Sequence, residues 1–340
     1  MKRTVWHTPK AGAIDRLKLH EQTMLKLANG KIRIQVRSVG LNFADIFAIT
    51  GLYSATPQGA FIPGLEFSGE VIEVAETGSE HTYKVGDVVM GVTRFGGYAS
   101  KIDIEPEYLT PLPKDWSFQQ GAAYLVQTLT AFYALTELGN IKANQNVLIH
   151  SAAGGVGLQA MKLVKAMGAN PIGAVGSSTK AEFLKTLEFT EVYMRQKHFD
   201  HQLSQEKRQF DLVLDGIGGA VQQASFNALK PMGRLVVFGA AEFTPGKNRP
   251  NYLKAAWQFL KRPKYDVMDM ISENKSVMAF NLIWLWQQVD YLTELIQRMQ
   301  DYQISAPYVG HEYPFDRAHD ALHCLREGQS IGKVVLNIEE

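Results

Sequence analysis

The sequence is very poor in cysteine: among 340 residues only Cys324 carries a thiol. A disulfide framework is therefore excluded, and so is any zinc site that needs two or more cysteine ligands. One free thiol beside eleven methionines is typical of a reducing compartment. We expect a cytoplasmic protein.

Long apolar runs and an excess of one charge are missing as well. The longest apolar run, residues 277–286, is interrupted by Asn281 and is too short to cross a bilayer. The opening MKRTVWHTPK leads into polar residues, so we expect no signal peptide. Lys and Arg total 35 against 34 Asp and Glu, which gives no electrostatic reason to expect nucleic acid or an anionic membrane as partner.

The residues that are present form two different patterns. A chain of 340 residues exceeds one ordinary core and suggests two domains. Residues 31–42 (KIRIQVRSVGLN) alternate apolar and polar side chains, as half-buried strands do, and residues 85–92 resemble them. After about Leu125, apolar strands alternate with helices. This order predicts an α/β fold with a doubly wound parallel sheet beside a β-rich domain.

A glycine turn lies at the start of the alternating part. The segment HSAAGGVGL places Gly154, Gly155, Val156 and Gly157 between a strand ending near Ser151 and a helix. Glycines allow a tight turn and let backbone N–H groups approach a pyrophosphate at the helix N-terminus. The alternative is a tight strand-to-helix turn without a ligand. We expect a dinucleotide here.

The end of the next strand, AVGSSTK, indicates which dinucleotide. NAD sites usually carry Asp or Glu there for the ribose hydroxyls, but this strand end offers Ser177, Ser178 and Lys180. Arg195, past the third strand, adds a second cation at the same edge. Hydroxyls and cations suit a 2′-phosphate, so we expect NADPH rather than NADH. Each cation taken alone could also be an ordinary surface residue.

Several motifs together resemble one known family over nearly the whole chain. They are GLNFADIFAITGLY, PGLEFSGEV, VGDVVMG, HSAAGGVGLQA, LKPMGRLVVFGAA and IGKVVL. The sequence resembles the medium-chain dehydrogenase/reductase superfamily, in its zinc-free quinone oxidoreductase branch. It is most similar to the synaptic vesicle amine transport protein homologue group. The resemblance implies a GroES-like catalytic domain of residues 1–125 and 308–340, split around a Rossmann NADPH-binding domain of residues 126–307.

The same resemblance implies that no metal is bound. Zinc-dependent members carry a cysteine where this chain has Asn42 and Phe43, and a histidine where it has Leu65. A catalytic zinc needs three protein ligands and an open position. Glu66, which follows Leu65, is then expected to be a structural anchor held by backbone N–H groups.

Without a metal, the side chains near the nicotinamide must orient the acceptor. By resemblance Asn42 lies near the nicotinamide, and Tyr53 is the candidate hydrogen-bond donor to an oxyanion. The alternatives are an Asn in a turn and a half-exposed loop tyrosine. Carboxyl ends of parallel strands bind ligands, so the end of the strand near 234–240 should also contact the cofactor. The further cofactor contacts predicted are Thr130, Phe238, Gly239, Ala240, Phe280, Leu282 and Lys333.

Two of these residues have simpler interpretations. Thr130 could be a helix cap, and Lys333 could be a solvated lysine at a strand start. The insert of residues 242–278, rich in aromatics and lysine, is expected to form an extra helix that covers the sheet edge. The mixture of aromatics and lysines in this insert could touch a membrane surface, but we expect no membrane association.

Two functions remain possible from sequence. The first is an NADPH-dependent oxidoreductase of quinones or activated α,β-unsaturated carbonyls, with a small apolar substrate. The second is an NADPH-binding protein with little or no turnover. We also expect a homodimer, because the strand near 276–284 could pair with its copy in a second subunit.

Overall fold

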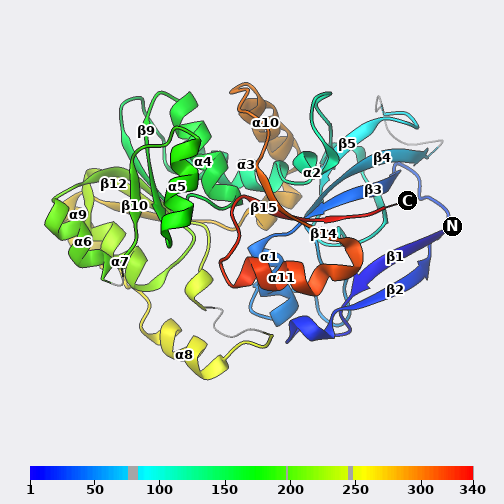
Figure 1. The fold of residues 1–340 in the computed structure, drawn as a ribbon, viewed down its shortest axis with the longest axis horizontal. Coiled ribbons are helices and arrows are strands. Elements are labelled where there is room, and N and C mark those ends of the chain that lie inside the picture. The colour runs from blue at the N-terminus through cyan, green and yellow to red at the C-terminus, as the bar shows by residue number, and fades with distance from the viewer. Residues whose placement is uncertain (76–82, 197, 244–247, 340) are drawn as a thin grey trace.

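A computed structural model describes residues 1–75, 83–196, 198–243 and 248–339 of the chain. It confirms the predicted α/β fold: a parallel sheet with helices lies beside a mostly antiparallel sheet (Figure 1). A large hydrophobic cluster continues from one half into the other. The site described below lies where these halves meet.

The middle of the chain forms a six-stranded parallel sheet, as the alternation of strands and helices predicted. Its order is β10-β9-β8-β11-β12-β13. The strands are β8 (Asn146–His150), β9 (Asn170–Val175), β10 (Val192–Met194), β11 (Phe210–Asp215), β12 (Leu229–Val237) and β13 (Ser276–Ala279). The connecting helices are α4 (Gly155–Ala166), α5 (Ser178–Thr186), α6 (Phe199–Glu206) and α7 (Gly219–Asn227). The central strands are almost wholly apolar because both faces of the sheet are covered.

The N-terminal part and the tail share a second sheet of seven strands, ordered β14-β15-β3-β4-β5-β7 with β6 on β3. These strands are β3 (Ile32–Gly40), β4 (Glu66–Val74), β5 (Val88–Val92), β6 (Lys101–Ile104), β7 (Leu109–Pro111), β14 (Val309–Pro314) and β15 (Lys333–Asn337). Strand β15 pairs antiparallel with β3, which brings the end of the chain into the N-terminal sheet. β1 (Lys2–His7) and β2 (Lys18–Thr23) form a separate hairpin.

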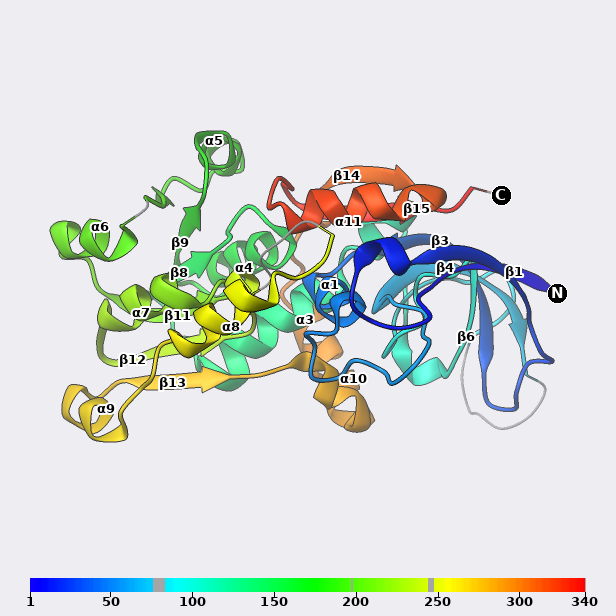
Figure 2. The same cartoon turned by 90° about the horizontal axis from the view of Figure 1, so that it is seen from below.

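Helices fill the junction between the sheets and the surface of the second one (Figure 2). They are α1 (Phe43–Thr50), α2 (Phe118–Gly121), α3 (Leu125–Tyr133), α10 (Val289–Gln300) and α11 (Ala318–Arg326). Helix α3 packs on α4 and α10, and its last turn continues as a π-helix over Ala134–Leu138. Between β13 and α10, the 3₁₀ segment η5 (Leu282–Gln287) leads back to the junction.

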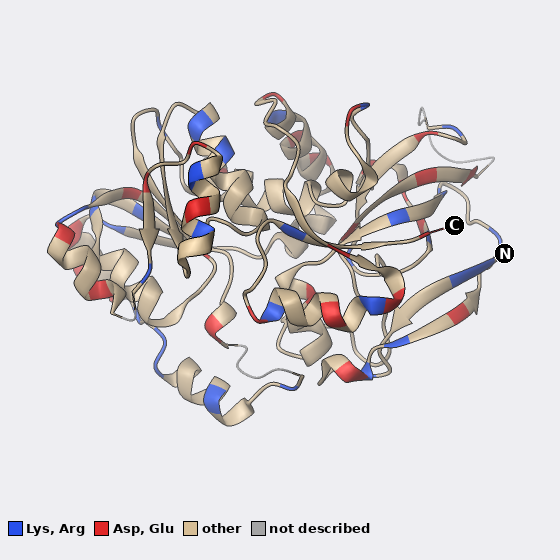
Figure 3. Ribbon diagram, viewed as in Figure 1, with Lys and Arg blue, Asp and Glu red and all other residues tan. Residues whose placement is uncertain are grey.

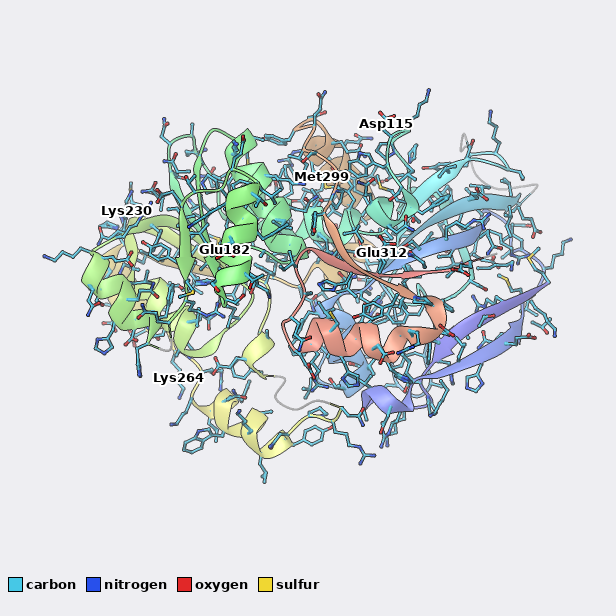
Figure 4. The ribbon with its side chains drawn as sticks, viewed as in Figure 1. Asp115, Glu182, Lys230, Lys264, Met299 and Glu312 are labelled. Carbon is cyan, nitrogen blue, oxygen red and sulfur yellow. The ribbon has the colours of Figure 1, made fainter. Side chains whose placement is uncertain are left out.

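The insert corrects one expectation. It forms α8 (Tyr252–Leu260) and α9 (Val267–Glu273), neither of which buries a residue, so α8 does not cover the sheet edge. Leu253 is 87% exposed, and α8 projects from the body in Figure 1. β13, at the end of the strand order, forms that edge instead. Lys264, labelled in Figure 4, lies in the connection from α8 to α9. Residues 244–247 of the expected insert lie outside the described residues.

The charge pattern agrees with the composition. Lysine and arginine alternate with aspartate and glutamate over both halves of the molecule (Figure 3). Among the described helices, none combines the length and apolar character needed to cross a membrane.

Candidate cofactor and substrate site

The glycine turn joins β8 to α4 at the carboxyl edge of the parallel sheet. A Cβ on Gly157 would lie 2.3 Å from the Ser151 carbonyl oxygen, so only glycine lets α4 begin this close to the strand end. Gly154 to Val156 are partly exposed. The first N–H groups of a helix lack intrahelical partners and carry a partial positive charge. The turn therefore has the geometry that a phosphate site needs, and phosphate binding here stays a prediction.

Two cations meet at the end of the neighbouring strand. The Ser177 hydroxyl caps α5 by accepting from the Lys180 N–H at 3.4 Å, and the Lys180 ammonium donates to the Gly328 carbonyl at 2.6 Å. Burial, and then the nearby Arg195 guanidinium, lower the pKa of Lys180. The Arg195 Nη1 is buried and has no hydrogen-bond partner among the described residues. An anionic ligand would both satisfy this nitrogen and reduce the repulsion between the cations.

The acid near Arg195 is Asp215, and it already accepts hydrogen bonds from the backbone. Asp215, the last residue of β11, accepts from the backbone N–H groups of Ile217 at 2.8 Å and Gly218 at 3.1 Å. Burial raises the pKa of Asp215 to about 6, although those N–H groups and Arg195 act in the opposite direction. Arg195 therefore keeps a free nitrogen beside Ser177 and Lys180, and this group of residues fits a 2′-phosphate.

A buried polar cluster lies at the junction of the halves. The Lys333 ammonium donates to Glu66 Oε1 at 2.5 Å and to Asn42 Oδ1 at 3.0 Å. The Gln127 amide donates to the same two oxygens, at 2.6 Å and 2.8 Å. The side chains of Lys333 and Glu66 are 3% and 1% exposed, so this ion pair is almost fully removed from water. We call these four residues, Asn42, Glu66, Gln127 and Lys333, the junction cluster.

The junction cluster shows the contacts of three residues singled out from the sequence. Glu66 accepts from one backbone N–H, that of Val126 at 3.1 Å, but its other partners are side chains, so it is not held by backbone groups alone. Lys333 is not a solvated lysine. Asn42 donates its amide hydrogens to Glu66 at 3.0 Å and to the Gly40 carbonyl at 3.3 Å, which leaves no amide hydrogen for a substrate carbonyl.

The cluster also contacts the glycine turn. A Cβ on Gly155 would lie 3.1 Å from the Gln127 side-chain oxygen, and the Gly332 N–H donates to the Ala153 carbonyl at 2.7 Å. Asp45, in the first turn of α1, accepts from the backbone N–H of the N-cap residue Asn42 at 2.8 Å and so fixes the position of Asn42. Burial raises the pKa of Asp45 to about 7.

A small apolar cluster of buried side chains adjoins the junction cluster. Its buried members are Ala55, Leu65 and Ile283, with Ala44, Tyr53, Phe95 and Val126 packed around them. Leu65 precedes Glu66, so this apolar cluster begins beside the junction cluster. The Tyr53 hydroxyl donates to Asn281 Oδ1 at 2.7 Å, and burial raises the pKa of Tyr53 to about 12. One tyrosine–asparagine hydrogen bond therefore lies at the apolar cluster.

The other predicted contacts lie along the same edge. Phe238, Gly239 and Ala240 follow β12, and Phe280 follows β13 with its N–H on the Val237 carbonyl at 3.1 Å. Leu282 begins η5, and Ser178 begins α5. Thr130 is inside α3 and donates to the Val126 carbonyl at 2.7 Å, so the helix-cap interpretation is wrong.

Sequence reasoning missed three functional candidates. Gln127 is a buried amide within a mostly apolar helix, Asn281 interrupts an apolar run, and Asp215 ends a buried strand. A polar residue in a mostly apolar segment was the available signal in each case. In the described ranges, no group of three or more His, Cys, Asp or Glu side chains is placed to hold a metal ion.

Comparisons with known proteins agree with this architecture. Residues 28–114 match the family model described as alcohol dehydrogenase GroES-like domain, and residues 155–298 match that described as zinc-binding dehydrogenase. The synaptic vesicle membrane protein VAT-1 homolog of Homo sapiens is 30% identical over 332 residues, which cover 96% of this chain and 84% of that protein.

Two solved structures with the same fold are enzymes by their descriptions. The CurK enoyl reductase is 25% identical with a TM-score of 0.82, covering 99% of each chain. The quinone oxidoreductase of Thermus thermophilus, described also in complex with NADPH, is 26% identical with a TM-score of 0.79. That match covers 98% of this chain and 99% of the other.

Proposed function

The chain belongs to the medium-chain dehydrogenase/reductase superfamily, and from that premise we propose a zinc-independent, NADPH-dependent oxidoreductase that reduces quinones or activated α,β-unsaturated carbonyls. The observation that carries the proposal is the unpartnered Arg195 nitrogen beside Lys180, at a strand end without a carboxylate. The quinone and enoyl reductases of the same fold support the reaction class.

NADPH would be held along the carboxyl edge of the parallel sheet. The glycine turn would bind the pyrophosphate, and Ser177, Ser178, Lys180 and Arg195 would bind the 2′-phosphate. Thr130, Phe238 to Ala240, Phe280, Leu282 and the junction cluster would then surround the nicotinamide half. When bound, the nicotinamide supplies the hydride.

The acceptor would bind beside the apolar cluster of Ala55, Leu65 and Ile283. Leu65 stands in the position where zinc-dependent relatives place a histidine, so the cluster offers a hydrocarbon side chain instead of a metal ligand. Apolar side chains beside the acceptor would exclude water from the reacting carbons. A planar apolar ketone or quinone suits such surroundings.

One observation favours the second candidate, an NADPH-binding protein with little turnover. Asn42 donates its amide hydrogens, and Tyr53 its single phenolic hydrogen, to groups of the protein itself. Neither residue therefore offers a donor to an oxyanion in this conformation. The same cofactor site serves both candidates.

A substrate panel decides between the two. With 1,4-benzoquinone, 1,4-naphthoquinone and simple enones, we expect NADPH oxidation well above background, unchanged by a zinc chelator. NADPH binding measured by its fluorescence runs in parallel. Tight binding with no oxidation of NADPH by any acceptor would reject the enzyme and support the binding protein.

The homodimer remains our proposal, supported by the position of β13 at the end of the parallel sheet. Pairing of two copies of β13 would join the sheets of two subunits into one. We expect sedimentation at micromolar concentration to give about twice the mass of the chain, and a proline at Met278 to shift it toward monomer. Only monomer in the unmodified protein would contradict this.

A further inference from the structure

The orientation of the Asn281 amide is determined by the backbone. Asn281 caps η5, and its Oδ1 accepts from the Ile283 N–H at 3.4 Å. A backbone N–H can only donate, so the amide must present oxygen, not nitrogen, to it. The Tyr53 hydroxyl meets the same oxygen at 2.7 Å, and the phenol is therefore the donor in that hydrogen bond.

This arrangement decides which hydrogen-bond donor is free. A phenol has one hydrogen, and the hydrogen of Tyr53 is engaged by Asn281. Burial raises the pKa of Tyr53 to about 12, so the phenol stays protonated near neutral pH. The Asn281 Nδ2 carries two hydrogens, and no described residue accepts either of them.

Asn281 also lies at the right place along the chain. It follows Phe280, at the carboxyl end of the sheet, and precedes Leu282 and Ile283, one of the buried members of the apolar cluster. Tyr53, its hydrogen-bond partner, packs against the same cluster from the other half of the molecule. The side chain that carries the free Nδ2 thus adjoins both the apolar cluster and the edge that would carry the nicotinamide.

We infer that the Asn281 amide is the donor that binds the carbonyl oxygen of the acceptor, and that Tyr53 is a positioning residue that orients this amide. The inference rests on the proposed reductase and names its substrate class more closely: a neutral ketone or quinone with an apolar body and one accessible carbonyl oxygen. The sequence had favoured Tyr53 as the donor, because a phenol can hydrogen-bond an oxyanion.

The donor acts on charge that develops during the reaction. Reduction of an enone forms a C–H bond at the β-carbon with the hydride of NADPH. The double-bond electrons move to the carbonyl oxygen, giving an enolate, and the enolate then takes one proton from water. An N–H aimed at that oxygen stabilises the negative charge more strongly than the neutral carbonyl, and so raises kcat.

The decisive variant is Asn281→Asp, which keeps the acceptors for Ile283 and Tyr53 but removes both N–H groups. We expect kcat/KM for 1,4-naphthoquinone and for enones to fall about 100-fold, with the NADPH dissociation constant unchanged. Tyr53→Phe should cause a smaller fall, and should add little in the Asn281→Asp background, because it acts through Asn281. Asn251→Asp is the matched control, since Asn251 caps the exposed α8 in the same way.

Two results would overturn the inference. One is an Asn281→Asp variant with unchanged kcat/KM. The other is a loss of kcat/KM of about 100-fold in Arg94→Gln together with a small loss in Asn281→Asp. The Arg94 guanidinium lies 5.9 Å from the centroid of the Trp284 ring, and Trp284 follows Ile283 of the apolar cluster. Such a result would make Arg94 the donor.

If the unmodified protein oxidises no NADPH, the proposed function fails and the inference is tested by binding. Acetophenone would be titrated into protein loaded with NADP⁺, with tryptophan fluorescence as readout. Binding at least about 10-fold weaker in Asn281→Asp supports the donor assignment. Equal binding in both proteins rejects it.

Discussion

Replacing both Lys180 and Arg195 by alanine is expected to raise the dissociation constant of NADPH about 100-fold or more, and to leave that of NADH nearly unchanged. Charge-assisted hydrogen bonds contribute about 1.5–3 kcal/mol each, and two such bonds to a 2′-phosphate exist only for NADPH. The buried Nη1 of Arg195 has no partner among the described residues, so its loss breaks no hydrogen bond at that nitrogen. The measurement is fluorescence titration with each nucleotide.

The matched control removes two other lysines from the same half of the molecule. Lys165→Ala with Lys185→Ala changes the net charge equally, and these residues lie in the last turns of α4 and α5. We expect that variant to bind both nucleotides as the unmodified protein does. Equal weakening of NADPH and NADH by the Lys180 and Arg195 substitutions would show that the 2′-phosphate assignment is wrong.

Replacing Lys333 by methionine is expected to cost about 3–5 kcal/mol of the free energy of unfolding, because it leaves the Glu66 carboxylate buried without its cation. The pair is almost entirely removed from water, with Lys333 Nζ 2.5 Å from Glu66 Oε1. Urea denaturation followed by circular dichroism, at one protein concentration, measures the loss.

Two further variants separate the buried charge from other effects. Lys2→Met breaks the pair Lys2–Glu21, whose side chains are 73% and 63% exposed, and should lower the free energy of unfolding far less than Lys333→Met does. Combining Lys333→Met with Glu66→Gln removes both charges and should recover part of the lost stability. A Lys333→Met variant as stable as Lys2→Met would contradict the assigned role of the ion pair.

Local features of the site could be predicted from the sequence because they depend on neighbouring residues. The glycine turn lies between an apolar strand and a helix, and Gly157 is required by a local steric contact, the 2.3 Å approach to the Ser151 carbonyl oxygen. Ser177, Ser178 and Lys180 at the end of the next strand could also be identified from neighbouring residues alone. The alternation of strands and helices predicted the parallel sheet, and the motifs identified the superfamily.

Contacts between distant segments could not be predicted this way. Lys333 and Glu66 are 267 positions apart and meet only because β15 pairs with β3. Tyr53 and Asn281 are 228 positions apart, on opposite halves of the molecule. The expected covering role of α8 was wrong, because aromatic and lysine content does not say which surface a helix packs against.

The sequence by itself determined the fold class, the superfamily, the place of the glycine turn and the presence of cations instead of an acid at the next strand end. These features follow from side-chain periodicity, glycine geometry and charge within short segments. Only the tertiary structure decided which hydrogen-bond donors are free. In the folded chain the Asn42 amide donates to Glu66 and the Tyr53 phenol donates to Asn281, whereas the Nδ2 of Asn281 has no partner among the described residues. These partners lie far apart in the sequence and meet only when the chain folds.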